Sequence, residues 1–98
     1  MDFEWDERKA KENIAKHDGI SFDEATLAFY DEWAIEEFDD AHSDSSEKRI
    51  ILIGWSTNRL LRVAYTLREK ETIRIISAEK ARPFEETAYN KNRNEYDR

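Results

Sequence analysis

The stretch that decides the fold is LLRVAYTLREKETIRIIS, residues 60–77, which has the pattern of two strands joined by a charged turn. Residues 60–67 and 72–77 are rich in apolar and β-branched side chains, and residues 69–71 are all charged. A three-residue turn at 69–71 places Thr66 opposite Arg74 in an antiparallel pair. Because side chains alternate along a strand, one face of this hairpin is then apolar. It carries Leu61, Val63, Tyr65, Leu67, Ile73 and Ile75.

The opposite face of the hairpin carries three arginines. We expect the apolar face to lie under helices and the arginine face to form an exposed shelf. An ordinary solvated sheet face is the alternative, and a register slip of one residue would exchange the two faces. The residues expected on the shelf are Arg62, Ala64, Thr66, Arg68, Thr72, Arg74 and Ile76.

Further strands and helices are predicted on both sides of the hairpin. Residues 49–55, RIILIGW, are apolar on both faces, which is typical of a central strand. Gly19 suits a left-handed helix C-cap, Ser21 and Glu24 have the spacing of a capping box, and Pro83 suits the first turn of a helix. The remaining strands are expected at residues 2–5 and 33–38, and the helices at residues 6–18, 22–30 and 82–92.

This order of elements, β–α–α–β–β–β–β–α, predicts an α+β fold in a single domain of residues 1–98, with a polar tail from about residue 93. Four consecutive strands joined by short connections predict a small antiparallel sheet, a meander. We expect its helices, two N-terminal and one C-terminal, to pack on one face of that sheet.

The composition excludes several kinds of site. The chain has no cysteine, so it has neither disulfides nor thiolate metal sites. Its two histidines are far apart in sequence and no cluster has the spacing of ligands, so we expect no metal and no other cofactor. No stretch is apolar enough for a signal peptide or a membrane span, which predicts a cytoplasmic protein without membrane contact.

The net charge of −7 is distributed unevenly along the chain. Residues 21–47 contain ten acidic residues and no Lys or Arg, whereas residues 48–82 contain nine basic and three acidic residues, a sum of +6. A local basic face can bind phosphate groups even on an acidic protein, although the overall field weakens long-range steering.

Motifs spread along the chain resemble those of the BrnT family of bacterial toxins, the toxic components of type II toxin–antitoxin pairs. The resemblance covers about residues 3–89, and the order and spacing of its pieces agree with the family. The pieces are FEWDERKAKENIAKH at 3–17, GISFDEA at 19–25, DDAHSDSSEKR at 39–49, IGWS at 53–56, LLRVAYTLRE at 60–69 and RIISAEKA at 74–81, followed by Glu85 and Tyr89.

The resemblance implies a RelE-like fold and a ribonuclease that cleaves mRNA and inhibits translation and growth. It also implies a protein partner, a BrnA-like antitoxin with a ribbon-helix-helix DNA-binding part. The toxin and the antitoxin would form a hetero-oligomer that binds operator DNA through the antitoxin and represses its own operon.

Two positions depart from the family pattern. The family usually has Lys-His-Gly where this chain has Lys16-His17-Asp18-Gly19, and it commonly has a basic residue where Glu79 stands. A carboxylate at position 79 should repel an RNA phosphate. The alternative function is therefore a catalytically weak binding module that acts mainly in transcriptional autoregulation, and a structural protein without a partner is a third reading.

The shelf arginines are candidates for the chemistry that the resemblance implies. Metal-independent RNA cleavage needs a base for the 2′-hydroxyl, an acid for the leaving 5′ oxygen, and cations that stabilise the transition state. Arg68 and Arg74 suit the last role because a guanidinium presents a fork of donors that matches phosphate oxygens. Arg62 and Thr66 would extend the same RNA-binding groove. The alternative for these arginines is structural ion pairing with the acidic block.

The helix at residues 6–18 supplies the other candidates. His17 lies near its C-terminus, where the helix dipole favours a protonated imidazole, so it is a candidate general acid or phosphate contact. It shares a stripe with Ala10 and Ile14, so a half-buried packing role is the alternative. Basic and amide side chains near this stripe are candidates to contact RNA, with ordinary solvated side chains as the alternative. They are Lys9, which we assign to catalysis, and Asn13 and Lys16, which we assign to RNA binding. Lys80, which follows the strand at residues 72–77, is a further candidate for RNA binding.

Overall fold

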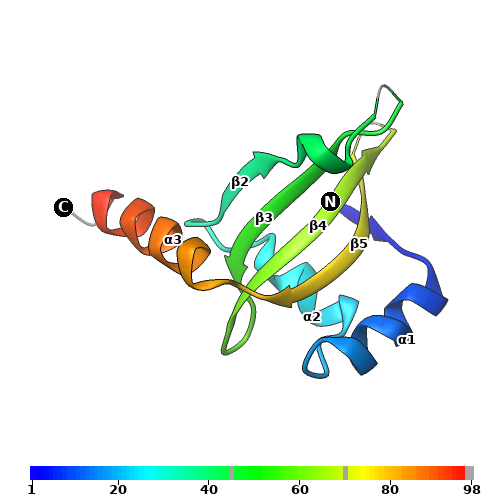
Figure 1. The fold of residues 1–98 in the computed structure, drawn as a ribbon, viewed down its shortest axis with the longest axis horizontal. Coiled ribbons are helices and arrows are strands. Elements are labelled where there is room, and N and C mark those ends of the chain that lie inside the picture. The colour runs from blue at the N-terminus through cyan, green and yellow to red at the C-terminus, as the bar shows by residue number, and fades with distance from the viewer. Residues whose placement is uncertain (45, 70, 97–98) are drawn as a thin grey trace.

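The computed structural model describes residues 1–44, 46–69 and 71–96, and within them five strands form one sheet (Figure 1). The α+β class and the predicted order of helices and strands are confirmed, with one short 3-10 helix, η1, in the acidic loop. In chain order the elements are β1 Asp2–Glu4, α1 Glu7–Lys16, α2 Phe22–Ala28, β2 Ile35–Phe38, η1 Asp40–His42, β3 Arg49–Trp55, β4 Leu60–Arg68, β5 Thr72–Lys80 and α3 Pro83–Tyr96.

The β4–β5 hairpin has the predicted register at its turn. Thr66 lies opposite Arg74 and Arg68 lies opposite Thr72, while Lys70 of the predicted turn lies outside the described residues. A β-bulge between Ala64 and Tyr65 shifts the register further from the turn, so that Arg62 lies opposite Glu79. Strand β5 therefore continues to residue 80 instead of ending at 77, because β4 offers it backbone partners along its whole length.

The sheet has the strand order β1-β5-β4-β3-β2. Strands β2 to β5 form the predicted antiparallel meander, and β1 adds a parallel strand at the β5 edge, which makes the sheet mixed. The short N-terminal strand thus covers only the first residues of β5, from Thr72 to Arg74. Helix α1 lies beside the rest of the β5 edge.

Helices α1 and α2 cover one face of the sheet and form the main core there. Phe22, Ala25 and Ala28 of α2 are buried against strand residues that include the predicted apolar face of the hairpin. Gly54 of β3 permits this packing, because a Cβ atom at that position would lie 2.6 Å from the carbonyl oxygen of Ala28. The strand residues in this core are Leu52, Leu61, Val63, Tyr65, Ile73, Ile75 and Ala78.

The prediction that all helices lie on one face is wrong, because α3 covers part of the opposite face. Its Tyr89 is buried there against Ile51, Ile53, Leu60 and Ala64. Strand β3 is apolar on both faces, so its second face also needs a cover, and α3 supplies it. The shelf is therefore exposed only in part.

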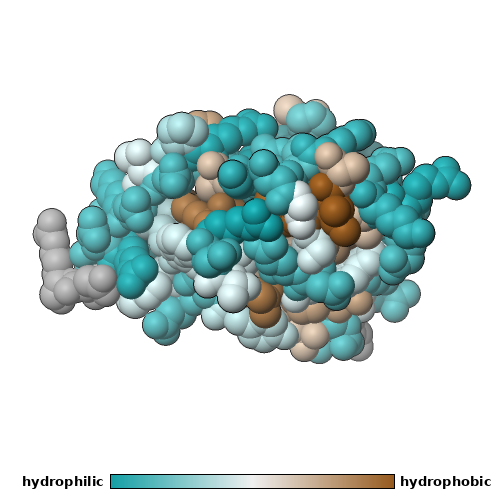
Figure 2. Space-filling view, turned by 90° about the horizontal axis from the view of Figure 1, so that it is seen from below, coloured by the Kyte–Doolittle hydropathy of each residue, from teal (hydrophilic) through white to brown (hydrophobic). Residues whose placement is uncertain are grey.

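Helix α3 runs to Tyr96, so the predicted helix end at residue 92 is wrong, while residues 97 and 98 lie outside the described part. Its second half projects away from the sheet (Figure 1). Charged and polar residues dominate the molecular face drawn in Figure 2, and apolar residues appear there only in small separate patches.

Candidate functional site

A row of side chains crosses the end of the arginine face that α3 does not cover. Backbone pairing aligns Glu4 with Arg74, Arg74 with Thr66, and Thr66 with Arg49, so these four side chains share one face. Arg74 Nη1 donates to Glu4 Oε2 at 2.6 Å. Thr66 is 2% exposed, and its hydroxyl donates to the carbonyl oxygen of Lys48 at 2.9 Å.

Arg49 is a member of this row that the sequence analysis missed. The apolar run at 49–55 drew attention to the strand, but pairing with Thr66 places its first residue on the arginine face. The Nε atom of Arg49 is buried and has no hydrogen-bond partner among the described residues. The signal that could have identified Arg49 is the alternation of side chains along β3. It assigns Arg49 to the arginine face once β3 is paired with β4.

Arg68 stands on the same face as Arg74, as predicted, and is the more accessible of the two. Its side chain is 52% exposed, against 31% for Arg74, and it lies 4.0 Å from Glu47. It lines an open cavity of about 400 Å³. The other lining residues are Phe38, Ser46, Glu47, Lys48, Ile50, Thr66 and Leu67.

Arg62 is separated from the other shelf arginines and lies against the start of α3. Its Nε donates to Glu85 Oε2 at 2.8 Å, and Glu85 is 5% exposed. The other oxygen of Glu85 accepts from the backbone N–H of Arg82 at 2.9 Å. This buried ion pair ties β4 to α3, so Arg62 has a structural role whatever else it contacts.

A second basic cluster lies in a cleft between α1 and β5. The cleft has a volume of about 190 Å³ and brings together three of the predicted basic residues, Lys9, Lys16 and His17. Both lysines are exposed, so both are accessible to an anion. The His17 side chain is 33% exposed. The cleft is completed by Glu12, Asn13, Ile76 and Ser77.

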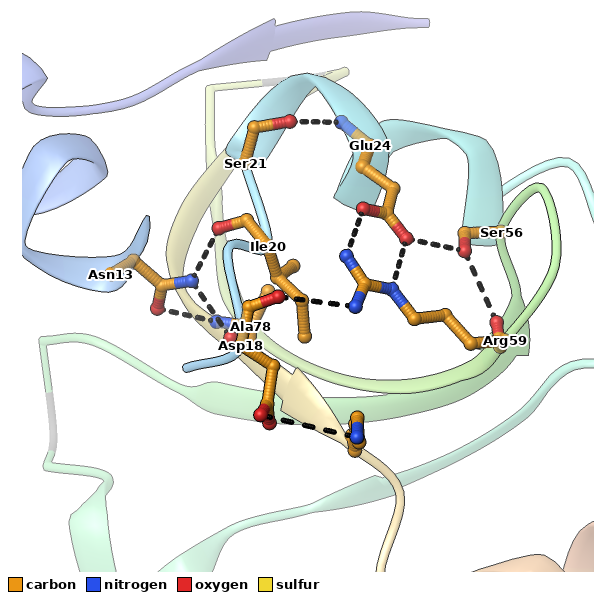
Figure 3. A network of polar contacts seen from close by, with 9 residues as sticks. Asn13, Asp18, Ile20, Ser21, Glu24, Ser56, Arg59 and Ala78 are labelled. Carbon is orange, nitrogen blue, oxygen red and sulfur yellow. Dashed lines mark hydrogen bonds and ion pairs between the residues drawn. The ribbon is translucent and has the colours of Figure 1, made fainter. Parts of the chain in front are cut away.

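Asn13 holds this cleft together through its buried amide (Figure 3). Its Nδ2 donates to the carbonyl oxygens of Ile20 at 3.0 Å and Ala78 at 2.8 Å, and its Oδ1 accepts from the N–H of Ala78 at 3.0 Å. The side chain therefore pairs with the edge of β5 as a neighbouring strand would. The prediction that the stripe of Ala10, Ile14 and His17 is the buried one is wrong for Ile14, which is 45% exposed. Asn13 is buried instead, at 5% exposed. Contact between Asn13 and RNA stays a prediction, and this geometry does not favour it.

The loop that follows His17 absorbs the extra residue by a left-handed conformation. Asp18 and Gly19 have φ angles of 52° and 71°, and Gly19 is the predicted left-handed residue after the helix. Arg59 Nη1 donates to the carbonyl oxygen of Asp18 at 3.2 Å (Figure 3). Arg59 thus holds the loop that follows His17, a contact that the turn signal at 56–59 did not reveal.

Glu24 fixes Arg59 in place. Arg59 donates to Glu24 through Nε at 2.8 Å and through Nη2 at 2.7 Å, and Ser56 Oγ donates to the same carboxylate at 2.7 Å (Figure 3). The Arg59 guanidinium holds the pKa of Glu24 below its usual value. The predicted capping box is half correct, because Ser21 Oγ accepts from Glu24 N–H while the Glu24 side chain turns to Arg59.

Glu79 lies beyond the cleft residues Ile76 and Ser77 along β5, opposite Arg62. Its carboxylate is 3.9 Å from His17 Nε2 and 3.2 Å from Arg82 Nη2. Lys80, the next residue, lies 3.9 Å from Asp18 and is 59% exposed. Each shelf arginine, and Lys80, therefore has a carboxylate within 4.0 Å. The alternative of ion pairing with the acidic segment 21–47 is correct only for Arg68, whose partner is Glu47, because Arg62 and Arg74 pair with carboxylates outside that segment.

No group of three or more His, Asp or Glu side chains in residues 1–44, 46–69 and 71–96 is placed to hold a metal ion. No helix in that same part of the chain combines the length and apolar character needed to cross a membrane.

Comparison with known proteins finds a matching family and similar solved structures. The family model described as "Ribonuclease toxin, BrnT, of type II toxin-antitoxin system" matches residues 5–85. The 1.1 Å crystal structure of the Brucella abortus ribonuclease toxin BrnT is similar in fold, with a TM-score of 0.63 and 25% sequence identity. That similarity covers 84% of this chain and 97% of the Brucella chain. No curated protein matches the sequence.

Proposed function

Because the chain belongs to the BrnT family of ribonuclease toxins of type II toxin–antitoxin systems, we propose that it is a metal-independent endoribonuclease of the cytoplasm. It cleaves mRNA and thereby inhibits translation and growth. Its partner is a BrnA-like ribbon-helix-helix antitoxin, which neutralises it in a hetero-oligomer that represses its own operon. The family description supports the ribonuclease activity and the protein antitoxin, and the positions of two basic clusters along β5 support the RNA site.

The observation that carries the proposal is the position of the two basic clusters along β5. Arg74 lies on the arginine face, and Ser77, three residues further along the strand, lines the cleft of Lys9, Lys16 and His17. At about 3.3 Å per residue, the arginine row and the cleft are about 10 Å apart. One RNA segment can therefore contact both.

The proposed reaction uses the RNA's own 2′-hydroxyl as nucleophile. Its oxygen loses its proton to solvent water and attacks the adjacent phosphorus, the bond to the 5′ oxygen breaks, and the products carry a 2′,3′-cyclic phosphate and a 5′-hydroxyl. Arg68 and Arg74 neutralise the charge that develops on the phosphate oxygens. His17 donates a proton to the leaving 5′ oxygen, and Lys9 and Lys16 hold neighbouring phosphates.

The ion pairs of the site favour low activity. RNA must displace Glu4 from Arg74, and Glu79 places a negative charge 3.9 Å from the proposed acid. These contacts favour the second candidate, a weak nuclease that serves mainly as an antitoxin-binding module. Both candidates bind the antitoxin tightly. The second differs from the first because it neither cleaves RNA nor arrests growth.

RNA cleavage in the presence of EDTA tests the proposal. The purified chain should cut RNA, and Arg74→Ala and Arg68→Ala should each lower the rate about 10- to 100-fold, since each removes a donor to the transition state. Arg8→Ala is the matched control, because Arg8 is an exposed arginine of α1 outside the cleft. Intact RNA together with tight antitoxin binding would support the second candidate instead.

A further inference from the structure

Strand β2 forms one edge of the sheet, and none of the described strands pairs with its outer side (Figure 1). Three of its four residues, Glu36, Glu37 and Phe38, are exposed. An edge strand presents unpaired N–H and C=O groups, to which an extended segment of another protein can add as a further strand. The β2 edge is therefore a possible docking point for a protein segment, and its neighbourhood indicates which kind.

An apolar cavity opens beside this edge, between β2, β3 and the first turns of α3. We call it the β2–α3 groove. Its volume is about 160 Å³, and a cavity of about 150 Å³ with apolar walls is known to hold a benzene molecule. One aliphatic or aromatic side chain therefore fits. The walls are Ile35, Ile51, Ile53, Phe84 and Ala88, together with Glu36, Glu37 and Glu85.

Phe84 forms an exposed wall of the groove. Its side chain is 64% exposed on α3, although the next turn of the same helix buries Tyr89. A large aromatic residue beside an apolar cavity adds apolar surface that a partner can cover. Phe84 is not needed to fill the core under α3, so its exposure fits a role in binding.

The charges around the groove are negative. All charged residues that line it are glutamates, and β2 comes from the segment 21–47, which has ten acidic residues and no Lys or Arg. Glu36 accepts a hydrogen bond from the Tyr65 hydroxyl and Glu85 is paired with Arg62, while Glu37 is exposed. Such a rim repels RNA phosphates and attracts lysine and arginine side chains.

We propose that the β2–α3 groove binds a segment of the protein antitoxin that has one apolar residue flanked by Lys or Arg. The segment adds to the β2 edge as a strand, places its apolar side chain in the cavity, and places its basic side chains against Glu37 and its neighbours. This inference rests on the proposed function, because its occupant is the antitoxin. Since Glu85 lines the groove and binds Arg62, the docked segment ends beside a predicted RNA-binding residue.

Calorimetric titration with the purified antitoxin, encoded by the reading frame next to the toxin gene, tests this inference. Glu37→Lys reverses one exposed charge and Phe84→Ala removes one exposed wall, so both variants should fold. Each should raise the Kd for the antitoxin about tenfold or more. The matched control is Glu95→Lys, the same charge reversal at an exposed position near the other end of α3, which should leave the Kd within about twofold.

RNA cleavage by the free variants is measured in parallel and should equal that of the parent chain, because neither residue belongs to the proposed RNA site. If the parent chain binds the antitoxin and both groove variants bind equally well, the groove is not the interface, while the proposed function stands. If the parent chain does not bind the antitoxin at all, both the groove and the proposed partner are wrong. Equal weakening by Glu95→Lys would also contradict the groove.

Discussion

Among single residues, Glu79 opposes the proposed RNA site most directly. It lies in register with Arg62, 3.9 Å from His17, and it also binds Arg82. Two like charges about 4 Å apart repel by about 1 kcal/mol in bulk water and by more near a protein surface. A carboxylate here therefore opposes the binding of a phosphate beside His17.

Replacing this carboxylate by a cation should raise activity. Glu79→Arg should increase the rate of RNA cleavage about tenfold, and Glu79→Gln should give a smaller increase, because the first adds a positive charge and the second only removes a negative one. Initial rates on the same RNA at fixed salt measure the effect. Glu95→Arg is the control for total charge. Rates that are unchanged or lower in Glu79→Arg would show that position 79 does not face the RNA.

Glu24 gives a prediction about pH and stability. Its pKa is lowered in the folded protein by Arg59, so its contribution to stability is complete above the usual glutamate pKa of 4.5 and is lost as the pH falls below that value. Glu24→Gln should lower the free energy of unfolding at pH 7 by about 1.5–3 kcal/mol, the usual contribution of hydrogen bonds to charged groups.

Urea denaturation at several pH values measures this difference. The gap between the parent chain and Glu24→Gln should stay constant from pH 7 to about pH 5 and shrink below the usual glutamate pKa. Asp23→Asn, at the exposed neighbouring position, is the control. A gap that widens as the pH falls would contradict the assigned role of the Arg59–Glu24 pair.

At the scale of elements, α1 is joined to β5 by one side chain. Asn13 satisfies both backbone groups of Ala78 and the carbonyl oxygen of Ile20. Asn13→Ala leaves these buried groups unpaired, and the free energy of unfolding should fall by about 2–4 kcal/mol. Urea denaturation measures it, with Lys11→Ala on the exposed side of α1 as the control. A loss below 0.5 kcal/mol, which is about the usual effect of a surface substitution, would show that α1 is held mainly by other contacts.

The same element shows how far the sequence predicts the structure. The hairpin register followed from a charged turn and strict alternation, so Arg68 and Arg74 were placed correctly on one face. The buried stripe of α1 was not predicted correctly, because apolar character favours Ile14 for burial, while the free edge of β5 needs the donor and the acceptor of Asn13. Such a partner is known only after the strands are paired.

Helix α3 illustrates a second limit of prediction from sequence. Its start followed from Pro83, but its face of the sheet depends on Tyr89, whose hydroxyl donates to Asp31 across the fold. The ion pairs of Arg62, Arg68 and Arg74 join residues that are distant in sequence, so neither their partners nor their geometry could be derived from local pattern. The resemblance to a family predicted a ribonuclease, whereas Arg49 was identified only from the pairing of β3 with β4.

At the scale of the whole molecule, the uneven charge of the chain becomes a division of the sheet. The basic segment forms β4 and β5 with the proposed RNA site, and the acidic segment forms β2 at the other edge with the proposed antitoxin groove. Strand β3 lies between β4 and β2, but Arg68 shares its cavity with Phe38 of β2, and the Arg62–Glu85 pair also joins the two surfaces. If both proposals hold, this arrangement would let a negatively charged protein attract RNA at β4 and β5 and a basic protein segment at the β2 edge.

The central claim is that the β4–β5 arginines and the α1 cleft together cleave RNA without a metal. The most direct test is mass spectrometry of the ends produced when the chain is incubated with RNA in EDTA, compared with the Arg74→Ala variant. We predict fragments with 2′,3′-cyclic phosphate and 5′-hydroxyl ends from the parent chain, formed at least about tenfold more slowly by the variant. Intact RNA, or the same fragments at the same rate from Arg74→Ala, would contradict the claim.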